Sequence, residues 1–181
     1  PHLVSPRLLQ EEGCLGTVPE DREEALGQAF RGFRAETGAE AGEAFARFCA
    51  EQAHWLEDYA LFMAIREAHG GPWWEWPAPL RDRDADALED TQRRFSEAIE
   101  RHRFVQWQFF RQWDRLKAYA NEAGLVLFGD MPIFVAHDSS EVWAHRELFA
   151  LDEEGQPETV AGVPPDYFSE TGQYWGNPHY R

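Results

Sequence analysis

A carboxylate and an aromatic loop in the last third of the sequence have the residue types of a site for a polar ligand. Asp130 directly follows the apolar run Leu125–Phe128, which predicts a short strand that ends at this acid. Further along, the run Ala161–Pro178 combines Gly, Pro, aromatic and amide residues, a mixture that an ordinary core element does not need. In α/β barrels, charged residues at strand ends and the loops beside them form the ligand site. We therefore treat both segments as candidate parts of one site.

Each candidate side chain has a binding interpretation and a structural one. Asp130 could bind a hydroxyl or stabilise a developing cation, or it could accept hydrogen bonds from loop amides. Asp166 follows two prolines, a context that favours a rigid turn in which the carboxylate accepts backbone amides over a catalytic role. The rings of Tyr167, Phe168 and Trp175 could stack on the apolar face of a sugar or fill a lid, and they could equally form a small satellite core.

Helices are expected to hold these segments in place, because apolar residues recur at steps of three and four through much of the chain. Aspartates and glycines mark where such helices begin and end. The expected helices cover Arg22–Phe33 after a cap at Asp21, Glu43–His69 before Gly70 and Gly71, a long region from Asp84 or Asp86 to Ala123 before Gly124, and a short stretch from a capping box at Asp138–Glu141 through His145. Smaller features expected are a helical turn around Arg7–Glu12 and a turn within Leu151–Gln156 between two short extended segments.

Three tryptophans lie in a proline-rich stretch just after the first long helix: Trp73, Trp74 and Trp76. The prolines predict that this stretch has no regular structure. The rings are expected to pack a corner between helices, and a sugar-binding platform is the alternative.

The order of elements predicts the α/β class. Gly124 separates a helix from the strand Leu125–Phe128, and this succession is the unit that repeats in a parallel sheet. It is the one strand that the pattern predicts firmly, whereas a closed barrel has eight, so the chain cannot contain a whole barrel. The sequence is expected to divide into mainly helical residues 1–124 and residues 125–181, which hold the strand, a short helix and the loop.

Composition narrows the class of ligand. The formal net charge of −16 disfavours nucleic acid and an anionic membrane surface, and it is compatible with a neutral, hydroxyl-rich ligand. Cys14 and Cys49 are far apart, so two reduced thiols are expected rather than a disulfide. The seven histidines form no close pair with metal-ligand spacing, and we expect no metal or other cofactor. No apolar run approaches the ~20 residues of a membrane span, and no signal peptide is recognisable.

Two long motifs, residues 129–143 and 161–178, resemble the amylomaltases, the 4-alpha-glucanotransferases of bacteria and plants. Residues 55–64 and 104–113 resemble the helices that precede these motifs in that family, and residues 3–6 with 11–13 are a weaker match.

The resemblance implies a cytoplasmic enzyme without a metal requirement and a helix-rich, partial (β/α)8 TIM barrel with a helical insertion. It also implies transfer of α-1,4-glucan segments between maltodextrins derived from starch or glycogen. Family enzymes retain the configuration at the anomeric carbon: a carboxylate forms a glycosyl-enzyme, and a carboxylic acid donates and later accepts a proton.

The resemblance also assigns roles to residues. Asp130 matches the family's substrate-binding aspartate at the end of the third barrel strand. The segment Asp166–Trp175 matches the mobile loop that closes over the active site, where Tyr167 and Phe168 would contact the glucan and Gln173 and Trp175 would line the base. A lid that excludes water would favour transfer over hydrolysis.

One departure limits what this chain is expected to do. The family's nucleophile, acid/base and third aspartate lie downstream of Tyr174–Pro178, and the sequence ends at Arg181. The chain is therefore expected to be an internal fragment that holds part of the substrate site and is inactive alone. The alternatives are an α-amylase-type hydrolase and a non-catalytic glucan-binding module. Apolar faces that missing elements would cover predict self-association.

Overall fold

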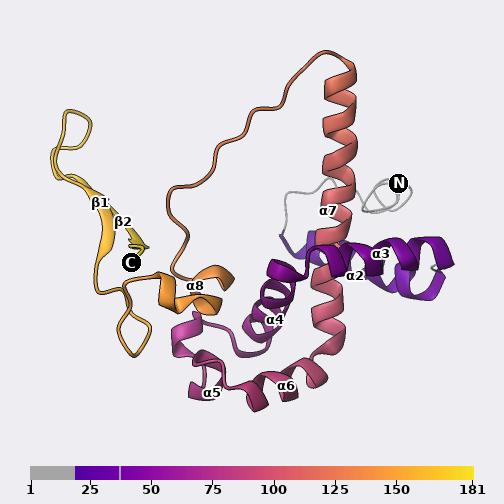
Figure 1. The fold of residues 1–181 in the computed structure, drawn as a ribbon, viewed down its shortest axis with the longest axis horizontal. Helices are drawn as coiled ribbons and strands as arrows, with labels where there is room; N and C mark the ends of the chain where they lie inside the picture. Colours follow the sequence, from indigo (N-terminus) through magenta and orange to yellow (C-terminus); the bar gives the residue numbers. More distant parts are fainter. Residues whose placement is uncertain (1–18, 37) are drawn as a thin grey trace. The chain divides into compact units, whose positions relative to one another are not determined.

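The computed structural model describes residues 19–36 and 38–181, which form a helix-rich structure with one two-stranded sheet (Figure 1). The described chain groups into two compact units. Unit 1 contains the residues up to Leu56 together with Glu97–Phe128, and unit 2 contains Glu57–Ser96 together with Gly129–Arg181. Each unit combines two separate stretches of the sequence. The division expected at residue 124 separated mainly helical residues from the strand and loop region, and it stays a prediction. The turn expected around Arg7–Glu12, the motif at residues 3–6 and Cys14 lie outside the described residues.

Unit 1 consists of helices that pack around an aromatic core. Its elements are α2 (Pro19–Glu36), α3 (Ala39–Glu51), the start of α4 (Ala53–His69) and nearly all of α7 (Ser96–Glu122). The buried rings of Phe30, Phe104 and Trp107 form its centre, and half-buried phenylalanines pack against them. The ring centroids of Phe30 and Phe104 lie 5.5 Å apart. Such offset ring contacts stabilise a core beyond the area that they bury.

Two of the predictions for the first helices are wrong. Helix α2 begins at Pro19, so Asp21 lies in the first turn and does not cap the helix. Proline suits that first position because its missing N–H would have no partner there. The helix expected over Glu43–His69 is two helices, α3 and α4, with Gln52 between them. The Gln52 side chain accepts a hydrogen bond from the Trp55 indole at 2.8 Å, which stabilises the start of α4 at the break.

The long helical region after Asp84 is also divided. Asp84 caps α6 (Ala85–Arg94) by accepting a hydrogen bond from the Ala87 amide at 3.0 Å. Of the two starts predicted from the sequence, this one is confirmed. Phe95 leaves helical geometry before α7 begins. The expected ends are confirmed, because Gly70 (φ 67°) and Gly124 (φ 76°) adopt the left-handed conformation that follows many helices.

Unit 2 packs around tryptophans. Its elements are most of α4, η1 (Trp73–Glu75), α5 (Ala78–Arg81), α6, α8 (Ser140–Ala144), η2 (Arg146–Leu148), β1 (Val160–Val163) and β2 (Gln173–Pro178). Trp73, Trp76 and Trp143 are buried, which confirms corner packing for the first two. The prediction that this stretch has no regular structure is wrong, because it forms η1 and α5, with its prolines at or before the helix starts, where the missing N–H costs no hydrogen bond. The indole of Trp143 donates to the carbonyl of Leu80 at 3.0 Å, so the buried N–H keeps a partner.

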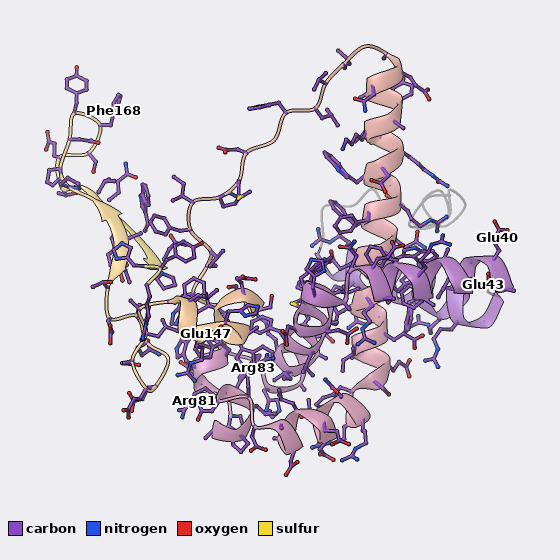
Figure 2. All side chains as sticks on the ribbon, viewed as in Figure 1. Glu40, Glu43, Arg81, Arg83, Glu147 and Phe168 are labelled. Carbon is purple, nitrogen blue, oxygen red and sulfur yellow. The ribbon has the colours of Figure 1, made fainter. Side chains whose placement is uncertain are left out.

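Arg83 joins the two sides of this core. Its backbone is left-handed (φ 60°), an unusual conformation for a residue with a side chain. The guanidinium lies 4.2 Å from the centre of the Trp143 ring and forms an ion pair with Asp58 at 2.5 Å. Figure 2 shows Arg83 beside Arg81, at the end of α5. The cation–π contact and the ion pair offset the backbone strain.

The strand predicted at Leu125–Phe128 is wrong for this structure. These residues have no regular structure, and their side chains are exposed. A strand needs neighbouring strands to satisfy its backbone groups and to cover its faces. Among residues 19–36 and 38–181, the only strands that pair as a sheet are β1 and β2, which are antiparallel. The parallel αβ unit predicted from the sequence is therefore not formed in the described chain.

No helix within the described ranges combines the length and apolar character that crossing a membrane requires.

Candidate functional site

The aromatic loop is the connection of a β-hairpin. Strands β1 and β2 pair with Gly162 opposite Tyr174 and Val163 opposite Gln173, and the connection covers residues 164–172. Gly172 closes it with a left-handed backbone (φ 75°), where a side chain would meet the carbonyl of Val163. The loop geometry therefore depends on glycine at this position.

Asp166 organises the loop backbone. One oxygen of its carboxylate accepts hydrogen bonds from the amides of Phe168 and Ser169, each at 2.8 Å. The Ser169 hydroxyl donates to the carbonyl of Gly172 at 2.7 Å. These bonds give Asp166 the turn-forming role that the two preceding prolines favoured.

The loop presents its aromatic rings to solvent. Tyr167 is 96% exposed and Phe168 is 91% exposed, and their rings meet edge to face at 5.7 Å. Figure 2 shows Phe168 at the tip of the hairpin connection. A satellite core is therefore excluded for these two residues. Large apolar side chains held in water at a rigid turn are typical of a surface that binds something.

Trp175 and Gln173 lie together on β2. The indole N–H of Trp175 donates to the side-chain oxygen of Gln173 at 3.0 Å. This bond fixes the direction of both side chains, and each remains exposed. The pair offers a ring face beside an amide, which suits a ligand with both apolar and hydroxyl surface.

Asp130 lies on an exposed segment that has no regular structure. Among the contacts between described residues, none joins its carboxylate to the aromatic loop. The residues that follow it do reach β2, because the carbonyl of Val135 accepts from the Asn177 side chain at 2.8 Å. The ring of Phe134 lies 6.3 Å from that of Trp175. The structure thus joins the two candidate segments through neighbours of the named residues.

The helix cap expected from Asp138 belongs to the next residue. Ser139 caps α8 by accepting from the amide of Val142 at 3.3 Å. Asp138 instead forms an ion pair with Arg66 at 2.9 Å and accepts from the amide of Trp73. A serine at this position caps a helix as well as an aspartate does, which leaves the carboxylate available for the ion pair.

His137 is a polar group of unit 2 that sequence reasoning missed. Its ring stacks on Trp74 with centroids 3.9 Å apart and planes at 5°, and its Nε2 lies 2.7 Å from the carbonyl of Gly155. Burial lowers the pKa of His137, because desolvation disfavours the charged imidazolium. The only signal in the sequence was the turn around Gly155, which gave no hint of a histidine partner.

This pKa shift predicts a pH-dependent stability. The folded state holds a proton on His137 less firmly than the unfolded chain does, so unfolding takes up protons below the ordinary value of 6.5. The contribution of the neutral ring to stability is present above that value and falls as the pH drops below it. We expect the stability difference between the unmodified chain and His137→Gln to shrink when urea unfolding is repeated at about pH 5.5 rather than about pH 7.5. A difference that does not change with pH would contradict this assignment.

Within the two described ranges, no three His, Cys, Asp or Glu side chains are placed so that they could hold a metal ion.

The comparison with protein families decides the relationship. The family model described as 4-alpha-glucanotransferase matches residues 11–181, which include the hairpin and the Asp130 segment. The chain belongs to the 4-alpha-glucanotransferase family. Two curated 4-alpha-glucanotransferases illustrate the similarity. The protein of Thermus thermophilus is 61% identical over 158 residues, and that of Synechocystis is 49% identical over 161 residues. These alignments cover 87% and 88% of this chain and 32% of each relative.

A solved amylomaltase structure has a similar fold. The amylomaltase of Streptococcus agalactiae, in complex with acarbose, matches with a TM-score of 0.85 and 41% identity. The match covers 91% of this chain and 33% of that protein. The chain thus spans about a third of the length of these three relatives.

Proposed function

We propose that this chain forms one wall of an α-1,4-glucan site, and that the whole protein is a 4-alpha-glucanotransferase that transfers glucan segments between maltodextrins. The observation that carries this proposal is the rigid, exposed aromatic tip of the hairpin, Tyr167 and Phe168, within a segment that matches the family. The acarbose complex of the amylomaltase with the similar fold supports an α-glucan as the ligand class. Maltodextrins from starch or glycogen fit that class.

The chemistry of the exposed groups suits a glucan. Tyr167, Phe168 and Trp175 offer ring faces for the apolar faces of glucose units. Gln173 offers an amide, and Asp130 offers a carboxylate that can accept hydrogen bonds from hydroxyls. A neutral ligand also avoids the repulsion that the net charge of −16 would impose on an anion.

The proposed reaction is a double displacement with retention. A carboxylate nucleophile forms a glycosyl-enzyme as the leaving sugar takes a proton from a carboxylic acid, and a sugar hydroxyl then replaces the enzyme while that residue takes the proton back. We assign no residue of this chain to either catalytic role. Closing the aromatic loop over the glucan would exclude water and favour transfer to a sugar. A partial (β/α)8 barrel, a cytoplasmic location and self-association through exposed apolar side chains are parts of the same proposal.

The chain alone is expected to be inactive, because it spans about a third of the length of the relatives compared above and we assign neither catalytic carboxylate to its residues. Incubation of the purified chain with maltotriose, followed by chromatography of the products, should show unchanged maltotriose. Formation of glucose and longer maltodextrins would contradict this expectation.

Trp175→Ala should weaken maltoheptaose binding by the chain about tenfold, since the loss of one stacking ring costs about 1.4 kcal/mol. Titration followed by calorimetry measures the effect. Trp113→Ala is the matched control, because Trp113 on α7 is 41% exposed and Trp175 is 48% exposed. Equal losses in the two variants would argue against a specific role of Trp175.

A further inference from the structure

The segment that carries Asp130 changes character within a few residues. Asp130, Met131 and Ile133 are exposed, and the segment has no regular structure. The next two residues, Phe134 and Val135, are half-buried. Contacts within unit 2 therefore fix the backbone a few residues after Asp130.

The first holding contact is a side-chain hydrogen bond. The Nδ2 group of Asn177, on β2, donates to the carbonyl of Val135 at 2.8 Å across 42 residues of sequence. The backbone fixes where this amide points. Gly176 before it is left-handed (φ 77°), and Pro178 after it is fully buried. An aspartate at this position would have the same shape and no N–H to donate.

The second holding contact is a cluster of rings. Phe134 lies 6.3 Å from Trp175, 5.8 Å from His179 and 6.3 Å from Tyr180, measured between ring centroids. All three partners belong to β2 or to the two residues that follow it. The ring and the backbone carbonyl next to it are thus both fixed on the same strand.

This attachment restricts where Asp130 can be. Five residues of fully extended chain span at most about 18 Å, so the Cα of Asp130 stays within that distance of the Cα of Val135. Val135 is bonded to Asn177 on β2, the strand that also carries Gln173 and Trp175. Without the attachment, this segment would lose conformational entropy when Asp130 binds the same ligand, and the affinity would be lower.

We propose that Asn177 and Phe134 are positioning residues that tie Asp130 to the aromatic strand, so that the carboxylate and the rings contact one glucan. This inference rests on the proposed function. It assigns to the Asn177 amide a role in substrate binding that acts through Asp130, without contact between the amide and the sugar.

Limited digestion with chymotrypsin tests whether the attachment exists. The peptide bond after Phe134 lies within the attached segment. The peptide bond after Phe128, whose side chain is 98% exposed, is an internal reference in the same chain. In Asn177→Asp, the ratio of cleavage after Phe134 to cleavage after Phe128 should rise about five- to tenfold, as expected for the loss of one hydrogen bond. Asn121→Asp adds the same charge at an exposed position of α7 and should leave the ratio unchanged. An unchanged ratio in Asn177→Asp would overturn the inference.

A double-mutant cycle tests the role in binding. Asn177→Asp should weaken maltoheptaose binding by the chain about fivefold when Asp130 is present, and should have little further effect in Asp130→Asn. Equal losses in both backgrounds would mean that Asn177 does not act through Asp130, and would overturn the inference while the proposed function stands. If Asp130→Asn alone leaves the affinity unchanged, or the unmodified chain binds no maltoheptaose, the proposed function of this surface fails and the role in binding fails with it. The cleavage ratio distinguishes these cases, because it reports the attachment without sugar.

Discussion

Gly155→Ala is expected to lower the free energy of unfolding by about 3 kcal/mol. Gly155 has a left-handed backbone (φ 82°), and an added Cβ would lie 2.4 Å from Cη2 and 2.7 Å from Cζ3 of Trp73. The indole cannot retreat easily. It is fully buried, and its Nε1 donates to the carbonyl of His137 at 2.8 Å. The substitution therefore combines backbone strain with overpacking of a rigid ring.

Gly70→Ala is the control for this prediction. Gly70 has a similar backbone (φ 67°), but an added Cβ would meet nothing within 4 Å. Its substitution should cost about 1 kcal/mol, from backbone strain alone. Urea unfolding of both variants, followed by tryptophan fluorescence, measures the difference. Similar losses would show that Trp73 moves aside and that the ring does not limit this turn.

Gly172→Ala should reduce maltoheptaose binding by the chain more than tenfold while leaving the helices intact. An added Cβ would lie 2.5 Å from the carbonyl oxygen of Val163 and 3.0 Å from the carbonyl carbon of Pro164. Both atoms belong to the hairpin backbone, so the loop must open to relieve the clash. Opening would displace Tyr167 and Phe168 relative to β2, and the loss of more than one stacking ring exceeds the tenfold change expected for a single ring.

Gly124→Ala is the matched control for the loop. Gly124 shares the left-handed backbone (φ 76°), and nothing lies within 4 Å of its added Cβ. Calorimetry with maltoheptaose measures the affinity of each variant, and circular dichroism measures helix content. Full affinity in Gly172→Ala would show that the loop geometry does not matter for binding.

The helices were largely predictable because their signals are local. Apolar spacing placed helical structure before Gly70 and Gly124, and Asp84 was one of two proposed caps. The breaks at Gln52 and Phe95 were missed, because the apolar spacing continues across both of them. At the first break, the Trp55 indole donates to the Gln52 side chain. Both residues fit the helical spacing, so the spacing gives no sign of a break there.

The turns in the candidate segments were predictable, and the side chains that support them were not. Asp166 makes the backbone contacts that its prolines suggested, and the turn after Leu151 forms, with Gly155 donating to the carbonyl of Asp152. Asn177 and His137 were not recognised, because their partners are carbonyl groups far away in the sequence. A backbone carbonyl has no residue-specific signature, so such contacts cannot be predicted from residue types alone.

The exposed run Leu125–Phe128 also bears on the order of folding. Helices such as α7 form through contacts between near neighbours and need no distant partner. An apolar run that becomes a strand only beside other strands must wait until those strands are close, and loop closure makes such distant contacts slow. These four residues can therefore take no part in a folding nucleus built from the described helices.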